Sequence, residues 1–434
     1  MRKFLFGLPL VLACNPTPDN GSDGGNDGGL PNTCPAHTGA GTKHSGDITA
    51  DQTWAEADSP HVITSSLSIA KGATLTIAPC AEVRIQATGV TVNGKLVANG
   101  TPVQPILITA DDPTKPFTYI RSFGSIDLAN VGIFHGGANT DPNGLGSIDV
   151  RADAAMPPAQ VARLKNVVID GSDQWGISLR ANALLTDDSA GIVVKNAALG
   201  PVRAEAPSAG SVPVGQYTGN GVDEILVIAN NPILQDATWH AVGVPFRIGD
   251  TKGNGNDMRV GGTAANSPVA TLTIEDGATV RVSKGGRILM NNASSMSTGA
   301  LVAKNVTFTS AEAAPAAGDW VGIYFGAAPL AQNKLDGVHV EYAGGPSFAK
   351  SYHCDLQGGF NEAEDAAIIM LGEPASEFIT NSTIKASAGY GIDRGWHGAP
   401  LDFVATNTFD AIAKCKQSYP RDANGNCPMS IPCP

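Results

Sequence analysis

The chain contains a long internal duplication, and this feature restricts its fold more than any other. Residues 73–85 read ATLTIAPCAEVRI and residues 270–282 read ATLTIEDGATVRV, so eight of thirteen positions are identical. Trp54 precedes the first copy as Trp239 precedes the second, and each is followed by a proline at the same spacing. Matches that recur in the same order predict a repeat architecture with two tandem homologous halves.

The offset between corresponding residues grows from 185 at the two tryptophans to 197 at the longer match. The second copy therefore carries an insertion, which we place in the Gly- and Asn-rich loop of residues 249–264. A third match, between residues 96–98 and residues 301–303, continues the repeat in the same order.

Within each copy, apolar and polar residues alternate with the period of a β-strand. Leu75, Ile77, Val83 and Ile85 point to one side, and the polar residues between them point to the other. We find no long amphipathic helix between such segments, so the pattern predicts an all-β protein rather than a doubly wound α/β sheet. Further short strands, separated by Gly, Asn, Asp and Pro turns, are expected at residues 90–92, 106–108, 167–169, 177–179, 192–194, 338–340 and 368–370.

The composition agrees with stacked strands. The chain has 434 residues and 51 glycines, and only 16% of its residues are charged and 6% aromatic. Helical bundles favour Glu, Lys, Arg and Leu, whereas small and β-branched residues suit strands.

Several segments resemble coils of right-handed parallel β-helix proteins of the pectate-lyase-like superfamily. Residues 72–79, GATLTIAP, resemble the "GxTLTIxPG" coil of surface proteins of this type, with Cys80 in place of the usual glycine. Residues 319–325, 335–345 and 384–392 are similar to other coils of the same proteins. The resemblance implies an all-β solenoid with two homologous halves, residues 34–237 and 238–413, and loop insertions at residues 151–158 and 201–221.

The N-terminus has the pattern of a bacterial lipoprotein. Residues 1–13 combine a basic start with an apolar run far shorter than the about 20 residues that span a bilayer, as in a signal peptide. The run ends in Val11-Leu12-Ala13-Cys14, which resembles a lipobox and predicts lipid on Cys14; an ordinary secretory peptide is the alternative. Residues 14–33 are rich in Gly, Asp and Pro and predict a flexible tether with a reach of roughly 25 Å. We therefore expect an exported protein, with membrane lipid as a partner, at the outer membrane or cell surface of a Gram-negative bacterium.

The cysteines fit an oxidising destination. Lipid on Cys14 leaves six, an even number, and we expect Cys34 to pair with Cys80 and Cys354 to pair within the C-terminal group. Residues 414–434 then form a Cys-rich tail stapled by at least one disulfide. The six candidates are Cys34, Cys80, Cys354, Cys415, Cys427 and Cys433.

Neither a metal ion nor a cofactor is predicted, because the sequence has no CxxC pair and no local Cys/His cluster. The net charge of −12 also argues against a nucleic-acid or other polyanionic partner, since phosphate binding requires clustered Lys and Arg.

The catalytic residues stay unknown, because no cluster in the sequence carries a reaction motif. Asp187 and Asp188 form an adjacent carboxylate pair, but neighbours on a strand point to opposite faces, so we interpret them as turn residues. In the run His353-Cys354-Asp355 adjacent side chains cannot serve as nucleophile and base, and Cys354 completes the even cysteine count.

One cluster is a candidate glycan site. Asp393, Arg394, Trp396 and His397 lie within five residues and offer a base beside an aromatic platform. The alternative is an exposed loop in which Asp393 and Arg394 form an ion pair.

The sequence favours a non-catalytic role in surface binding, adhesion or envelope structure, with a glycan or a surface protein as the partner. The alternative is a carbohydrate-active enzyme, either a polysaccharide lyase or a glycoside hydrolase. An enzyme requires carboxylates or basic groups from several coils in one groove, whereas a binder requires exposed aromatic side chains. The fold alone does not decide between these roles.

Overall fold

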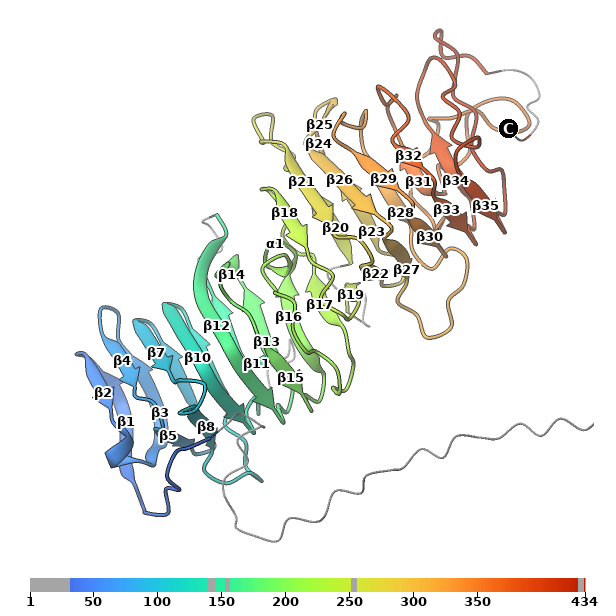
Figure 1. Cartoon of the computed structure of the whole chain (residues 1–434). Coiled ribbons are helices and arrows are strands. Elements are labelled where there is room, and N and C mark those ends of the chain that lie inside the picture. Colours follow the sequence, from blue (N-terminus) through green and yellow to red (C-terminus); the bar gives the residue numbers. More distant parts are fainter. Residues whose placement is uncertain (1–31, 139–144, 153–156, 251–255, 428–432, 434) are drawn as a thin grey trace, which may run out of the picture.

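The computed structural model describes residues 32–138, 145–152, 157–250, 256–427 and 433. These residues form an elongated stack of short strands that runs from the N-terminal end to the C-terminal end (Figure 1). The predicted lipidation site Cys14, with the signal peptide and most of the tether, lies outside the described residues.

Most strands belong to one large sheet. Its 23 strands are β1 (Thr42–Ile48), β2 (Gln52–Trp54), β3 (His61–Ile69), β4 (Thr74–Ile77), β5 (Glu82–Ile85), β6 (Gly89–Val92), β7 (Lys95–Asn99), β8 (Ile106–Ala110), β9 (Tyr119–Ser122), β10 (Ser125–Phe134), β11 (Gly146–Arg151), β12 (Ala159–Asp170), β13 (Trp175–Arg180), β14 (Ala183–Leu185), β15 (Val193–Lys195), β16 (Gly200–Glu205), β17 (Ile225–Ile228), β19 (Phe246–Ile248), β22 (Thr279–Val282), β27 (Thr307–Ser310), β30 (His339–Glu341), β33 (Thr383–Lys385) and β35 (Thr408–Asp410).

Two sheets of five strands complete the C-terminal part. One contains β18 (Ala237–Trp239), β21 (Ala270–Ile274), β26 (Gly299–Lys304), β29 (Lys334–Asp336) and β32 (Ile379–Thr380). The other contains β20 (Asp257–Val260), β23 (Arg287–Met290), β28 (Gly322–Phe325), β31 (Ala366–Met370) and β34 (Tyr390–Arg394). Outside these sheets lie the antiparallel pair β24 (Asn292–Ala293) and β25 (Met296–Ser297), the 3₁₀ turn Glu56–Asp58 and the single-turn helix α1 (Ala206–Ala209).

The strands of the three large sheets pair in parallel, and consecutive strands in the chain are usually not partners. Strand β4 pairs with β7, and β5 pairs with β8, so each strand meets its partner after two intervening strands of the chain. Inward side chains of successive strands therefore lie above one another in register. The predicted all-β fold is confirmed, as are the short strands expected from the alternating pattern.

A ladder of apolar residues follows from this register in the N-terminal part. Trp54 aligns with Ile77, which aligns with Ala98. The ladder continues through Leu128 and Leu164. These side chains are at most 3% exposed, and burial of each large one contributes about 1.5–3 kcal/mol.

The C-terminal part contains a second ladder of almost the same residues. Trp239 aligns with Ile274, which aligns with Ala303. Leu335 and Ile379 continue it. Both tryptophans are buried.

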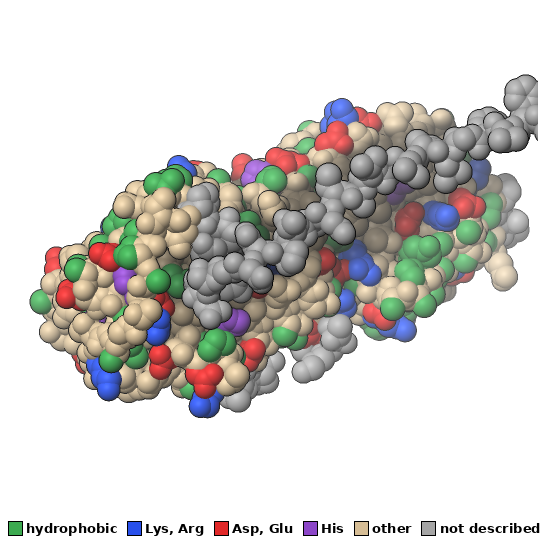
Figure 2. All heavy atoms as spheres, turned by 60° about the horizontal axis from the view of Figure 1, so that its bottom comes forward, with side chains coloured by type: hydrophobic (Ala, Val, Ile, Leu, Met, Phe, Trp, Pro, Cys, Tyr) green, Lys and Arg blue, Asp and Glu red, His purple; other side chains and the backbone are tan. Residues whose placement is uncertain are grey.

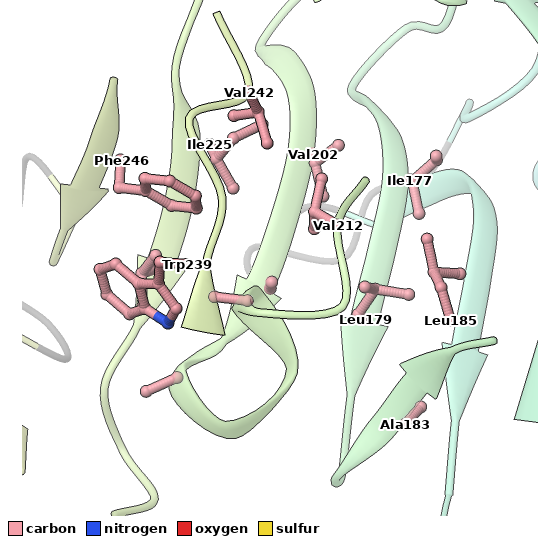
Figure 3. Close-up of a cluster of buried hydrophobic side chains, with 14 of the residues drawn as sticks. Ile177, Leu179, Ala183, Leu185, Val202, Val212, Ile225, Trp239, Val242 and Phe246 are labelled. Atoms are coloured by element: carbon pink, nitrogen blue, oxygen red, sulfur yellow. The ribbon is translucent and has the colours of Figure 1, made fainter. Parts of the chain in front are cut away.

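The core between the two ladders is continuous. Figure 3 shows Ile177, Val202 and Ile225 side by side on neighbouring strands, with Leu179, Trp239 and further apolar side chains close by. All of these side chains belong to one buried cluster that extends from Ile48 to Phe403.

The turn after the duplicated strands explains the unusual Cys80. Its backbone has φ of 63°, in the left-handed region that costs an L-residue about 1–2 kcal/mol. The corresponding residue of the second copy is Gly277, with φ of 80°. Cys80 adopts the glycine conformation while its sulfur is bonded to Cys34, with 5.2 Å between the Cα atoms.

Two expectations about insertions were wrong in part. Residues 201–221, predicted as a loop, include most of β16, which pairs with β13 and β17. Residues 249–264 include β20, which pairs with β23. Both strands were missed because polar and glycine-rich neighbours dilute their short apolar runs. In residues 151–158, Arg151 ends β11 and residues 153–156 lie outside the described residues.

Candidate functional site

The four residues of the predicted glycan site lie on β34 and just after it. His397 is exposed, but Asp393, Arg394 and Trp396 are at most 4% exposed. The interpretation of this stretch as an exposed loop was therefore wrong for three of the four residues. A bare coil would direct every second residue to solvent, but all five residues of β34 are buried.

Asp393 and Arg394 are not hydrogen-bonded to each other. The Asp393 carboxylate accepts a hydrogen bond from Ser418 Oγ at 2.8 Å. The Arg394 guanidinium donates to the carbonyl oxygens of Ser418 and Leu401, at 2.6 Å each. These partners lie in the segment after β34, and its residues 415–418 pair with β34 through backbone hydrogen bonds.

A long connection, residues 345–365, joins β30 to β31 and brings new groups to Asp393. His353 Nδ1 lies 2.9 Å from Asp393 Oδ1 and also contacts Glu364 Oε2. All three residues are at most 1% exposed. Glu364 Oε1 accepts the backbone N–H of Tyr352 at 2.5 Å. The sequence separates these residues by up to 40 positions, so spacing alone gave no signal for the cluster.

The other edge of the His353 ring faces a third carboxylate. His353 Nε2 lies 3.7 Å from Glu362 Oε2, which is longer than a hydrogen bond. The same Glu362 oxygen accepts a hydrogen bond from the Tyr390 hydroxyl at 2.9 Å, and it lies 3.6 Å from Lys414 Nζ. His353 therefore lies between a buried acidic side and a partly exposed one.

Burial and charge both shift the proton affinities in this cluster. Burial opposes the protonated form of His353, but Asp393 and Glu364 outweigh it and raise the pKa of the imidazole well above its usual value. Burial also raises the pKa of the Glu364 carboxyl, against the lowering effect of His353. Burial raises the pKa of Tyr390, and the hydrogen bond to Glu362 adds to this shift. Burial lowers the pKa of Arg394 to about 10.

Disulfides hold the covering segments in place. Cys354, next to His353, is bonded to Cys427, and Cys415 is bonded to Cys433. With the bond between Cys34 and Cys80, all six predicted cysteines are paired, and the prediction of a stapled C-terminal tail is confirmed. A bonded Cys354 cannot act as a nucleophile, in agreement with the dismissal of His353-Cys354-Asp355.

The connection 345–365 also displays aromatic side chains. Phe348 is 93% exposed, and Tyr352 and Phe360 are 42% and 43% exposed. The Arg421 guanidinium lies over the Phe360 ring at 4.1 Å from its centroid, and it also donates to the Ser351 carbonyl. Sequence patterns missed these aromatics because they follow no strand or helix period.

Asp187 and Asp188 are turn residues, as predicted. They follow β14, and their side chains accept hydrogen bonds from Gln160 Nε2 and Arg163 Nε, both at 2.6 Å. The pair is used in contacts between neighbouring strands rather than directed at one common point.

Comparisons of the chain with protein-family models, with curated proteins and with solved structures find no match. The described residues contain no helix with the length and apolar character needed to cross a membrane.

Proposed function

We propose that this chain is an exported lipoprotein, anchored through lipid on Cys14, whose right-handed parallel β-helix binds a neutral surface glycan without catalysing a reaction. The lipobox, the tether of residues 14–33 and the six paired cysteines support export and anchoring. A cell-surface or outer-membrane position in a Gram-negative bacterium is part of the proposal.

The β-helix is proposed to consist of two tandem homologous halves. The ladder Trp54–Ile77–Ala98–Leu128 and the ladder Trp239–Ile274–Ala303–Leu335 have the same residues in the same register. Each tryptophan also stacks on a ring in the next strand, Trp54 on His61 at 5.0 Å and Trp239 on Phe246 at 4.8 Å. Shared register over four rungs supports descent from one doubled unit.

The exposed aromatic side chains of the connection 345–365 carry the functional proposal. Rings of Phe348, Tyr352 and Phe360 offer apolar faces with a fixed shape, on a segment stapled at Cys354. Exposed apolar patches on a protein surface often mark interaction sites. The apolar C–H faces of sugar rings are a suitable partner for such rings.

Charge favours a neutral glycan over an acidic one. The net charge is −12. Figure 2 shows basic and acidic side chains interspersed on the visible part of one face, rather than a single basic patch. A polyanion binds where Lys and Arg gather, so the charge distribution gives it no preferred place on this face.

The enzyme alternative has less support at this site. The carboxylates of Asp393 and Glu364 are 0% exposed, and their oxygens contact His353 rather than solvent. A polymer substrate cannot reach groups at this depth in the structure as described. Two further carboxylates near His353, Asp355 and Glu362, accept hydrogen bonds from the backbone of residues 361–362 and from Tyr390.

The test is glycan binding by the full chain in detergent micelles, over an array of neutral and acidic polysaccharides. Phe348→Ala and Phe360→Ala should each weaken binding at least about tenfold, the effect of about 1.4 kcal/mol. Phe123→Ala is the matched control, because Phe123 is 51% exposed on a different part of the stack. Equal losses in all three variants, or release of reducing or unsaturated sugar ends by the wild type, would contradict the proposal.

Anchoring has its own test. Cells that produce the full chain are labelled with radioactive palmitate, and the wild type should take up label and sediment with membranes. Cys14→Ser should do neither. Label in Cys14→Ser would show that lipid attachment at this residue is not the anchor.

A further inference from the structure

Three potential ligand atoms converge on one point under the connection 345–365. They are His353 Nδ1, Glu364 Oε2 and Asp393 Oδ1, and all three side chains are buried. Two ligand atoms that each lie about 2.1 Å from one ion are themselves about 3.0–3.4 Å apart at octahedral or tetrahedral angles. The separation of 2.9 Å between Nδ1 and Asp393 Oδ1 is close to that range, and the contact between Nδ1 and Glu364 Oε2 is shorter.

Hydrogen bonding alone does not satisfy this arrangement. An imidazole Nδ1 carries at most one proton, yet two buried carboxylates approach it, one from the connection 345–365 and one from β34. Among the described residues, Asp393 Oδ2 has no hydrogen-bond partner, although Asp393 is completely buried. Unpaired buried polar atoms of this kind are rare, and each one is costly. A cation between the carboxylates compensates their charge without a second proton.

The surroundings match those of a metal ligand. A histidine that binds a metal through one ring nitrogen usually directs the other ring N–H toward a carboxylate, and its carboxylate co-ligands are themselves hydrogen-bonded. His353 Nε2 faces Glu362 at 3.7 Å, and Glu362 is fixed by the Tyr390 hydroxyl. Ser418 Oγ donates to Asp393 Oδ1, and the Tyr352 N–H donates to Glu364 Oε1.

The donor set selects the class of ion. An imidazole nitrogen with two carboxylate oxygens suits divalent first-row transition metals and Zn²⁺, whereas Ca²⁺ and Mg²⁺ prefer oxygen ligands only. The six cysteines of the described part are in disulfides, so they offer no thiolate to compete for the ion.

We propose that His353, Glu364 and Asp393 bind one divalent metal ion, with Zn²⁺ or a first-row transition metal as the occupant. The ion joins the connection 345–365, which supplies His353 and Glu364, to β34, which supplies Asp393. Because the site is buried and closed by the bond between Cys354 and Cys427, the ion enters during folding. It fixes the base of the segment that displays Tyr352 and Phe360. The site does not depend on the glycan proposal.

The experiment loads the full chain with metal during refolding. The protein is unfolded with its disulfides intact, treated with chelator, and refolded with Zn²⁺, with Co²⁺ or without metal. After desalting, the wild type should retain about one equivalent of metal. The Co²⁺ form should show visible absorption bands of a ligand field with nitrogen and oxygen donors. The melting temperature should rise by about 3 °C at a metal concentration a hundred times the Kd.

Variants locate the site. Asp393→Asn and Glu364→Gln keep side-chain volume and should lose the retained metal and the shift in melting temperature. His44→Gln is the control, because His44 lies outside the cluster, with its Nε2 3.0 Å from His61 Nδ1. It should retain the metal.

Two results would overturn the proposal. One is a wild type that retains no metal and shows no absorption bands after refolding with either ion. The other is retention in Asp393→Asn and Glu364→Gln with loss in His44→Gln. If the two carboxylate variants do not fold, nitrogen NMR of the wild type decides. A His353 ring that keeps both protons in the presence of metal contradicts the site, and loss of the Nδ1 proton supports it.

Discussion

Replacement of Asp149 by alanine should destabilise the stack more than its size suggests. Asp149, on β11, is completely buried, and its Oδ2 accepts hydrogen bonds from Arg121 Nε at 2.8 Å and from Arg151 Nε at 3.1 Å. Parallel, in-register pairing brings this about, because Asp149 aligns with Arg121 of β9. Without the carboxylate, two guanidinium groups remain close together with no anion between them.

The magnitude follows from burial. Two unit charges about 4 Å apart attract by about 4 kcal/mol at an effective dielectric constant near 20, but desolvation offsets much of this. Loss of one partner of a buried pair costs about 3–5 kcal/mol. The side chains of Arg121 and Arg151 are 18% and 23% exposed, so water can reach them. We therefore expect the lower end, about 3 kcal/mol, or roughly 4 °C in melting temperature for a folded part of this size.

The assay compares denaturant and thermal unfolding of the full chain, disulfides intact, for Asp149→Ala and Asp188→Ala. Asp188 is the matched control, since it accepts from Arg163 Nε at 2.6 Å but has a side chain 58% exposed. Exposed pairs of this kind contribute about 0.2–1 kcal/mol. If Asp149→Ala costs no more than Asp188→Ala, burial does not govern the strength of these ion pairs and the reasoning is wrong.

Three further predictions concern acid, the core and the tail. Burial, with the nearby charge of His61, lowers the pKa of His44 to about 4, so the contribution of His44 to stability is complete above pH 6.5 and is lost as the pH falls toward 4. His44→Gln should therefore reduce the fall in melting temperature over this pH range, and an unchanged fall would contradict the assignment. Trp239→Ala should lower the free energy of unfolding by about 3–5 kcal/mol, because the ring is 0% exposed and stacks on Phe246. Circular dichroism during urea unfolding measures this loss, and a loss below about 1 kcal/mol would show that the ladder repacks. Removal of the disulfide between Cys354 and Cys427, whose sequence separation is 73, should cost about 4 kcal/mol of stability by chain entropy, against about 3 kcal/mol for the disulfide between Cys415 and Cys433, whose separation is 18. Calorimetry of the paired Cys→Ser variants should reproduce this order, and the reverse order would count against the entropic estimate.

Much of the scaffold could be predicted from local patterns. Strands such as β4 and β22 are predicted by the alternation of apolar and polar residues, and inward residues such as Leu75 and Val280 are buried as the pattern requires. The pairing of Cys34 with Cys80 was also accessible, because these are the only two cysteines near that end of the described chain. Strand β16 could not be predicted from the sequence, because its residues GPVRAE begin with Gly and Pro and include charged residues.

The cluster around His353 shows where local reasoning ends. Asp393 was singled out for its neighbours in sequence, Arg394, Trp396 and His397, but its contacts in space are to His353 and Ser418. Those partners come from a connection and from the tail, neither of which has a period. No rule of spacing relates them to β34.

The sequence by itself determined that the chain forms stacked strands with a repeated unit, because a period of two and a duplicated segment are properties of residues near one another in the chain. Only the tertiary structure decided which polar side chains are buried together. The connection 345–365 and the tail cover β34 and exclude water from it, and that exclusion turns Asp393 from an outward-facing strand residue into part of a buried cluster with His353 and Glu364.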